Sequence, residues 1–514
     1  MHVRRLLLAL ALMGCRSPEP AGTVFYASGA DLQSINPLLT TQPLARQLQR
    51  YVLFTTLVRY DSALAPMPYL ARSWAWSDAH RTLTFVLQPG VRWHDGVRTT
   101  AADVKFTLEA AKDPTTGYPR SGELECLANI DAPRHRGTEA PDTVRLTFCK
   151  PQERIPDVLF DLAILPAHLL AGLPHAALRS ATFNEHPVGN GPFRFVAHES
   201  GRRWVFEANK DFPAALGGPP ATQRFVIVIV DESTTKLAAL VDGELDVAGI
   251  NPMHAAVVRR IAKRAVLSYP ILFTYGVVWN TSRAPWDDPR LRRALTLALD
   301  RRQMVDAFIW GFGEVADGPV PSWHPLAASV PHIPFDRAAS GALLDSLGWR
   351  VSPSGVRERG GRQLALTLTT VGSSDNVLEQ LIQADFAAVG VRADIRQLEL
   401  GAFLAEAEGG ARDYDALVTG IPGDPALGYL GALFDSRRLE GPMQYARYRN
   451  AEVDRALDAG DLAAVQRLAA RDLPISFLFH TRGVQGLNTR VHGVRMDLRG
   501  ELATVAAWHL GARN

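Results

Sequence analysis

Cysteine is scarce in this chain, and the usual sequence signatures of catalysis are missing. The 514 residues contain only three cysteines, and neither a G-x-S-x-G nucleophile elbow nor an H-E-x-x-H zinc motif occurs. The 14 histidines include no pair spaced i, i+4 and no Cys-x-x-Cys occurs, which disfavours a bare metal site. A catalytic triad can still be assembled from residues distant in sequence. We expect a protein that is not an enzyme and has no cofactor or metal.

An excess of charge of one sign and a long apolar run are also missing. The formal net charge is +2 and no Lys/Arg block dominates one region, which argues against binding nucleic acid. No stretch reaches about 18 consecutive apolar residues, so no transmembrane helix is expected. The 47% hydrophobic and 21% charged residues are typical of a soluble globular protein. A chain of this length predicts two or three compact lobes.

The amino terminus has the pattern of an export signal. Arg4 and Arg5 precede an apolar run at 6–13, which is too short to span a bilayer. The run ends in Leu-Met-Gly-Cys at 12–15, which looks like a lipobox with Cys15 as the acylated first residue of the mature protein. We predict a signal peptide at 1–14, a tether at 15–22 and lipid anchoring on the periplasmic or extracellular side of the cell envelope. The alternative is an ordinary secretory signal in which the cysteine is incidental.

Lipidation of Cys15 would leave two cysteines in an oxidising compartment, where an even number favours a disulfide. Cys126 and Cys149 lie in strand-like runs, 124–130 and 143–150, joined by a polar loop. The sequence favours a disulfide between them, with two free buried thiols as the alternative. A metal site is disfavoured because only His135 lies between them.

Strand and helix patterns alternate along the rest of the chain. Strands are expected at 23–28, 82–87 and 224–230, and a capping box at Thr100 and Asp103 predicts a helix to 111. A helix is expected over 289–310, with Arg292 and Arg293 on a solvated face. This alternation favours an α/β fold.

Ten short blocks, spread over nearly the whole mature chain, carry a family resemblance. They occupy 57–61, 69–74, 90–96, 100–104, 164–168, 187–193, 243–247, 279–281, 291–295 and 298–301. Examples are Gly-Val-Arg-Trp-His-Asp-Gly at 90–96 and Gly-Glu-Leu-Asp-Val at 243–247. In order and spacing the blocks resemble the bacterial solute-binding proteins of family 5, which serve oligopeptide, dipeptide and nickel ABC importers.

The resemblance implies a fold of the periplasmic-binding-protein type II class. Two hinged lobes are expected, with an extra subdomain inserted in the first. Lobe I would comprise 23–46, 184–268 and 477–514, the inserted subdomain 47–183, and lobe II 269–476. The implied function is that of the extracytoplasmic component of an ABC importer, a monomer that captures a peptide-like solute between its lobes and delivers it to the permease.

The resemblance also suggests ligand-binding residues. In the peptide-binding members an acidic residue after a Gly-Trp step pairs with the ligand's amino group, and Asp424 occupies this region. Ile421 replaces the tryptophan, and the stretch before Asp424 is about three residues short, so a structural Asp-Pro turn is the alternative. Further candidates are Trp279, Asn280, Trp310, Trp323 and His480. A receptor for a nickel chelate, sugar or opine, and a sensor or assembly protein of the same fold, remain alternatives.

Overall fold

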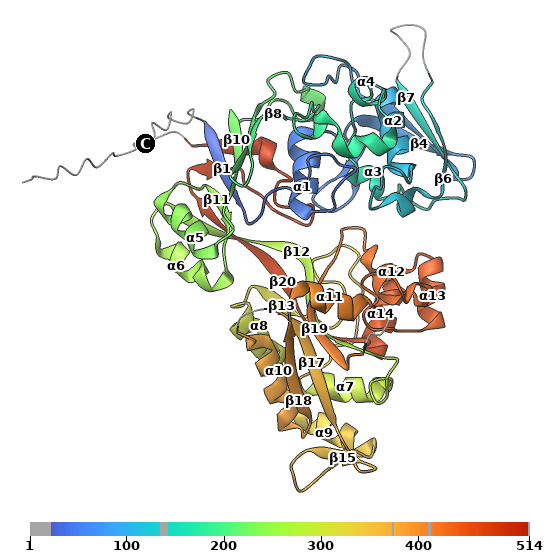
Figure 1. Ribbon diagram of the computed structural model, residues 1–514, viewed down its shortest axis with the longest axis vertical. Coiled ribbons are helices and arrows are strands. Elements are labelled where there is room, and N and C mark those ends of the chain that lie inside the picture. The colour runs from blue at the N-terminus through green and yellow to red at the C-terminus, as the bar shows by residue number, and fades with distance from the viewer. Residues whose placement is uncertain (1–21, 134–141, 373–374, 410–412, 512–514) are drawn as a thin grey trace, which may run out of the picture.

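The computed structural model describes residues 22–133, 142–372, 375–409 and 413–511. In this part of the chain an 11-stranded mixed sheet extends through two lobes (Figure 1). Its main path runs β18 (Arg392–Leu398), β17 (Ala365–Val371), β19 (Ala416–Pro422), β12 (Arg264–Trp279), β20 (Ile475–Asn488), β11 (Val247–Gly249), β1 (Thr23–Ser28), β10 (Arg224–Ile229), β9 (Arg203–Ala208) and β8 (Phe193–Glu199), and β13 (Gly313–Val315) pairs with β20. The α/β prediction is confirmed.

The two longest strands connect the lobes. β12 and β20 are antiparallel and run side by side from the upper lobe to the lower lobe (Figure 1). Their register shifts between Pro270 and Thr274, where the chain passes between the lobes. The residues at which each lobe begins and ends stay a prediction.

The first lobe contains a second, four-stranded sheet in the order β4 (Ala71–Ser77), β5 (Thr82–Leu87), β7 (Thr143–Phe148) and β6 (Leu127–Asp131). Around the two sheets lie α1 (Pro43–Leu48), a π-helical turn (Gln49–Leu53), the hairpin β2 (Val58–Tyr60) and β3 (Pro66–Pro68), α2 (Ala101–Lys112), α3 (Val158–Asp161), α4 (Ala167–Leu170), α5 (Ser233–Asp242), α6 (Ala255–Arg260), and the short β21 (Val491–His492) and β22 (His509–Leu510). One continuous apolar core joins the two sheets through Phe85 of β5 and Phe225 of β10, and it also includes the loop residues Phe54 and Trp93. The region predicted as an inserted subdomain therefore shares the core of its lobe.

Local signals in the first lobe agree with the structure. The Thr100 and Asp103 capping box begins α2, with the Thr100 amide donating to the Asp103 carboxylate at 2.7 Å. Cys126 and Cys149 form a disulfide between the ends of β6 and β7, where the Cys149 amide also donates to the Cys126 carbonyl at 2.7 Å.

The second lobe buries both faces of its part of the sheet. Its helices are α7 (Pro289–Ala298), α8 (Arg301–Phe308), α9 (Arg337–Ser346), α10 (Val377–Ala388), α11 (Leu400–Glu408), α12 (Tyr429–Phe434), α13 (Ala451–Asp458) and α14 (Leu462–Asp472), with a small sheet of β14 (Arg350–Val351), β15 (Arg357–Arg359) and β16 (Arg362–Gln363). Neighbouring residues of one strand, such as Val277 and Val278, belong to different apolar clusters. This follows from the alternation of side chains along a strand.

Two expectations for 289–310 were wrong. The segment forms two helices, because the Asp300 carboxylate accepts the Gln303 amide at 3.0 Å and begins α8. Arg292 is buried, with 3% of its surface exposed, and donates to the carbonyls of Trp286 and Leu473 at 2.6 and 2.8 Å. Arg293 is exposed as predicted.

Candidate ligand-binding cleft

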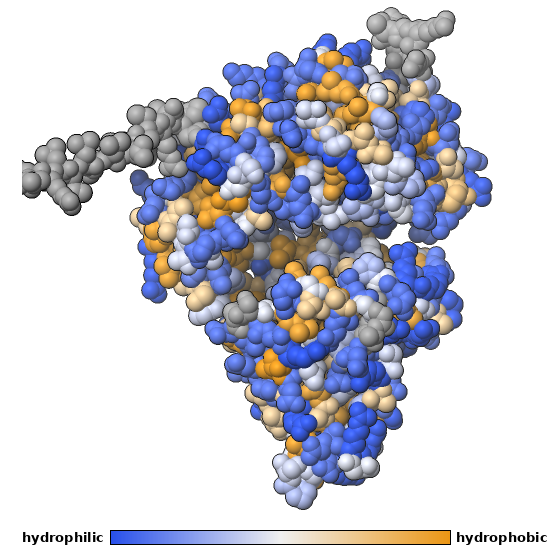
Figure 2. All heavy atoms as spheres, in the orientation of Figure 1, coloured by the Kyte–Doolittle hydropathy of each residue, from blue (hydrophilic) through white to orange (hydrophobic). Residues whose placement is uncertain are grey.

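A hollow separates the two lobes, and loops from each lobe meet at its edge (Figure 2). The Arg154 guanidinium of the first lobe donates to the carbonyl of Ala426 in the second lobe at 3.4 Å and to Asp157 at 3.3 Å. The neighbouring Glu153 carboxylate approaches Gly460, where an added Cβ would lie 3.1 Å from it. These contacts identify the loops at which the two lobes meet.

One wall of the cleft carries the carboxyl end of β19. Residues 416–422 pair with β12 on one edge, but only 416–418 pair with β17 on the other. Within the described ranges, residues 419–422 therefore have no strand on that second edge. The next residues, 423–426, include the carbonyl that Arg154 contacts, so this open edge ends beside the opposite lobe.

Asp424 organises the turn that follows β19. Its Oδ1 accepts the amides of Ala426 and Gly428 at 3.0 and 3.1 Å, and its Oδ2 accepts the amide of Tyr429 at 2.9 Å. A carboxylate has about four acceptor positions, and three are occupied by this turn. The geometry thus favours the structural Asp-Pro role over a free amine anchor.

An acidic and aromatic group in the first lobe lies close to this turn. The rings of Tyr60 and Phe160 stack with centroids 3.9 Å apart, and the Tyr60 hydroxyl donates to Asp157 at 2.7 Å. Burial raises the pKa of the Asp157 carboxyl, and the charge of Asp424 raises that pKa further. The Asp424 carboxylate of the second lobe therefore lies near enough to the first lobe to act on the Asp157 carboxyl.

Trp323, His480 and Arg482 cluster at the strands that connect the lobes. The Trp323 indole donates to the carbonyl of Ile271 at 3.0 Å, and its ring meets His480 edge-on at 6.2 Å. The Arg482 guanidinium lies 5.2 Å from the Trp323 ring centroid and donates to the Ser268 hydroxyl at 3.1 Å. In the described part of the chain no carboxylate lies within ion-pair distance of Arg482.

His480 is a buried, neutral residue. Only 2% of it is exposed, its Nδ1 lies 2.8 Å from the Thr274 hydroxyl, and burial lowers its pKa to about 3. It supports the Trp323 ring and does not supply charge.

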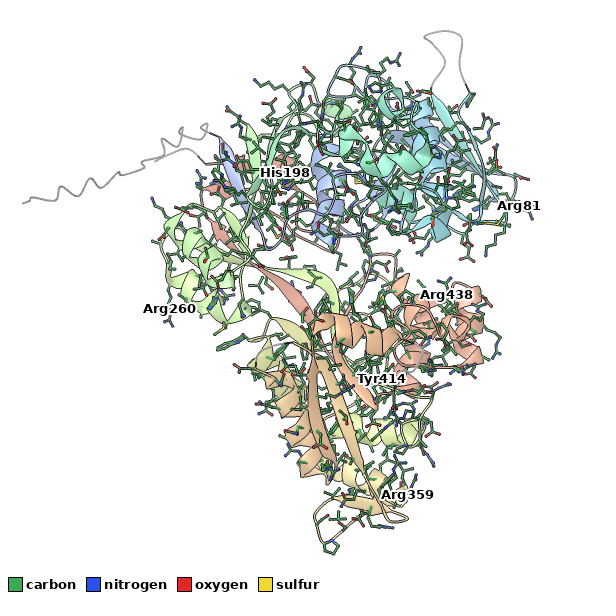
Figure 3. All side chains as sticks on the ribbon, viewed as in Figure 1. Arg81, His198, Arg260, Arg359, Tyr414 and Arg438 are labelled. Atoms are coloured by element: carbon green, nitrogen blue, oxygen red, sulfur yellow. A yellow bond between two sulfur atoms is a disulfide. The ribbon has the colours of Figure 1, made fainter. Side chains whose placement is uncertain are left out.

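Two other predicted residues, Trp279 and Asn280, are buried and offer no surface to a ligand, whereas a role for Trp310 stays a prediction. Trp279 has no exposed surface, stacks on Trp286 and donates to the Ser476 hydroxyl at 2.8 Å. Asn280 is 1% exposed and donates to the carbonyl of Tyr414 at 3.0 Å, inside the lower lobe where Figure 3 labels Tyr414. Both belong to the core, because a residue at the end of a central strand is covered on both faces. Trp310 is 55% exposed after α8, with a φ of 53°.

The comparisons with known proteins decide the family. Residues 65–438 match the model of the bacterial extracellular solute-binding proteins, family 5. The chain belongs to this family. Its members are binding proteins, and the name of the family places them outside the cytoplasm.

Relatives of this solute-binding protein align over most of its length. Protein XP55 of Streptomyces lividans is 30% identical over 468 residues, which cover 88% of this chain and 83% of XP55. The oligopeptide-binding protein AppA of Bacillus subtilis is 23% identical, with 96% and 92% covered.

Solved structures show the same fold. AppA of Bacillus subtilis, in complex with a nonapeptide, superposes with a TM-score of 0.74 at 22% identity, covering 95% of this chain and 99% of AppA. NikZ of Campylobacter jejuni, in complex with Ni(L-His), gives 0.76 at 23% identity, with 96% and 100% covered. The predicted two-lobed type II fold is confirmed.

Sequence reasoning missed Tyr60, Asp157, Phe160 and Arg482. Tyr60 lies within one of the matching blocks, but nothing in its spacing relates it to 157–160. The Arg-Ile-Pro-Asp run at 154–157 was the available signal, since a charged residue before a turn is a frequent loop contact.

Two general findings complete the description of the solute-binding protein. Among the described residues, no helix is both long and apolar enough to cross a bilayer. Over the same ranges, no three His, Cys, Asp or Glu side chains are grouped so that they could hold a metal ion.

Proposed function

We propose that this chain is the substrate-binding component of an ABC importer and captures a short peptide or peptide-like solute between its lobes. The observation that carries the proposal is the open edge of β19 at 419–422. An extended peptide pairs with such an edge through its main chain, which gives affinity for many sequences. Relatives named as oligopeptide- and dipeptide-binding proteins, including that of Escherichia coli at 25% identity, support it. No catalytic step is proposed.

Charged groups at the cleft suit the two ends of a peptide. The carboxyl groups of Asp157 and Asp424 favour a ligand ammonium near the turn, because a buried ammonium needs negative partners. Among the described residues the Arg482 guanidinium has no carboxylate partner, which favours a ligand carboxylate near the connecting strands. Asp424 has one acceptor position left, so its contribution is through charge and turn geometry.

Ligand discovery tests the proposal. Protein purified from cells grown in rich medium is measured by native mass spectrometry, and calorimetry then compares di- to pentapeptides with matched peptides methylated at backbone nitrogens. We expect a heterogeneous bound mass of peptide size and at least tenfold weaker binding of the methylated set, which loses main-chain donors. A single non-peptide mass would refute peptide capture and favour a chelate, sugar or opine.

We also propose that Cys15 is lipidated and tethers a monomer to the membrane surface, with the permease as its partner. The Leu-Met-Gly-Cys sequence at 12–15, which precedes the described residues, supports this. Labelling with a radioactive fatty acid should mark the wild-type protein, whereas Cys15→Ser should be unlabelled. We also propose that the lobes divide at 268/269 and 476/477, because β12 and β20 run between the lobes at these positions.

A further inference from the structure

The first lobe contains a cavity that is separate from the cleft. Its volume is about 300 Å³, and its walls include Tyr51, Arg59, Tyr69, Phe212, Leu216 and Arg499. All of its lining residues lie in 51–69, 192–218 and 499–507, and none comes from the region predicted as lobe II. The volume is at the lower end of the range for small-molecule sites, about 300–1,000 Å³.

The charge of the cavity comes from one arginine. Its lining includes two arginines and no aspartate, glutamate, lysine or histidine. Arg499 is paired with Asp497, whose Oδ2 accepts its Nη2 at 2.6 Å. Arg59 has no carboxylate within ion-pair distance among the described residues, and its buried Nε has no hydrogen-bond partner there. Its guanidinium lies 4.3 Å from the Tyr69 ring centroid.

Apart from Thr504, the rest of the wall consists of tyrosines and apolar residues. Tyr51 and Tyr69 line the cavity together with Arg59, and Phe212 and Leu216 add apolar surface to it. Gly217 and Gly218 border the cavity with φ values of 119° and 75°, conformations that side-chain-bearing residues rarely adopt. The space beside Gly217 is open, since a Cβ added there would meet no atom within 4 Å.

We infer that this cavity is a second binding site, for a small aromatic carboxylate. The carboxylate pairs with the guanidinium of Arg59, an interaction for which the planar, fixed geometry of arginine is well suited. The aromatic ring of the ligand packs against Tyr51, Tyr69 and Phe212 in offset or edge-on contact. The site is independent of the peptide proposed for the cleft, because no lining residue is shared with it.

A matched pair of probes tests the inference. Binding of 3-phenylpropionate and of neutral 3-phenylpropionamide to the mature protein is measured by calorimetry and ligand-observed NMR. We expect saturable binding of the carboxylate, and binding of the amide at least tenfold weaker, because only the carboxylate satisfies Arg59. Equal affinities, or no binding of 3-phenylpropionate at millimolar concentration, would overturn the inference.

Variants locate the bound probe. Arg59→Gln should weaken 3-phenylpropionate binding at least tenfold, whereas Arg482→Gln in the cleft should leave it unchanged. If the results are reversed, the probe binds in the cleft and the inference is wrong. Ala503→Phe fills the cavity from its wall, tests the site if Arg59→Gln does not fold, and should abolish probe binding. It should leave peptide capture unchanged, so failure of the cavity proposal and failure of the peptide proposal are distinguishable.

Discussion

Glu501 is a buried carboxyl group held between two tyrosines. The Tyr269 hydroxyl donates to its Oε1 at 2.8 Å and the Tyr26 hydroxyl to its Oε2. Burial raises the pKa of Glu501 to about 7, from an ordinary value of 4.5. The folded state therefore retains a proton over a pH range in which the unfolded chain has released it.

The sign of the resulting pH dependence follows from this proton. The protonated Glu501 carboxyl contributes to the free energy of unfolding. This contribution is fully present below about pH 4.5 and is lost as the pH rises to about 7. Glu501→Gln keeps a neutral group of similar shape, so the variant should lack this part of the pH dependence. Urea unfolding at several pH values from 5 to 8 gives the free energy of unfolding as a function of pH. An equal pH dependence of this free energy in wild type and variant would contradict the assignment.

Asp161 is the buried partner of three guanidiniums. Arg46, Arg50 and Arg120 each form an ion pair with it. Burial alone would raise the pKa of Asp161, but the three positive charges outweigh burial and lower it to about 2. Removing the carboxylate would leave like charges close together in a partly buried site.

Asp161→Asn should therefore destabilise the protein by roughly 3–5 kcal/mol, measured by urea unfolding. The control is Asp211→Asn, since Asp211 pairs with Arg194 but its side chain is 86% exposed. The control should change stability by no more than about 1 kcal/mol. An equal loss of stability in the two variants would mean that neutralising the three arginines with Asp161 contributes little to the free energy of unfolding.

At the scale of elements, local sequence patterns predicted individual strands and helices, but the contacts between elements could not be predicted from them. The strand-like runs at 23–28 and 82–87 and the Thr100 capping box predicted β1, β5 and α2, because these signals lie within the segments themselves. Arg292 was predicted to be solvated because nothing in its helix reveals the carbonyls of Trp286, Asp472 and Leu473. The open edge of β19 likewise depends on where β17 ends. The turn at Asp424 could be offered from the sequence as an alternative to the amine anchor, because an Asp-Pro signal is local.

The glycine-rich turn at 187–193 shows the same limit. Glycines bracketed by prolines are typical of a tight turn, but the structure adds a close approach to the π-helical turn Gln49–Leu53. A Cβ at Gly191 would lie 2.6 Å from the carbonyl carbon of Leu53 and 2.7 Å from the amide nitrogen of Phe54. The Gly191 amide donates to the Leu53 carbonyl at 2.9 Å, so the two backbones cannot easily separate.

Gly191→Ala should cost about 1–3 kcal/mol of stability, because backbone must shift to accept the methyl group. Gly172→Ala is the matched control, since a Cβ there would meet no atom within 4 Å. Thermal unfolding of both variants measures the difference. A melting temperature of Gly191→Ala equal to that of the control would mean that the two turns do not pack this closely.

At the scale of the whole molecule, β12 and β20 run from one lobe to the other in the described part of the chain, and we expect the lobes to hinge about these two strands. A ligand that contacts both lobes shifts the population toward the closed form by its differential affinity for that form. Arg154 and Glu153 of the first lobe approach the second lobe at Ala426 and Gly460. Neither position belongs to 419–422, so we expect these two residues to stabilise the closed form without contacting a peptide on the β19 edge.

The double variant Glu153→Ala, Arg154→Ala should therefore weaken peptide binding by up to about fivefold, the size expected for exposed polar contacts. The loss should appear as faster dissociation, because the contacts form as the cleft closes. Surface plasmon resonance gives both rates, and small-angle scattering should show a smaller decrease in radius of gyration on binding than in wild type. Arg145→Ala, whose ion pair with Asp131 lies within the four-stranded sheet, should match wild type. A change confined to the association rate would mean that these residues steer the ligand and do not hold the lobes together, because steering acts before closure.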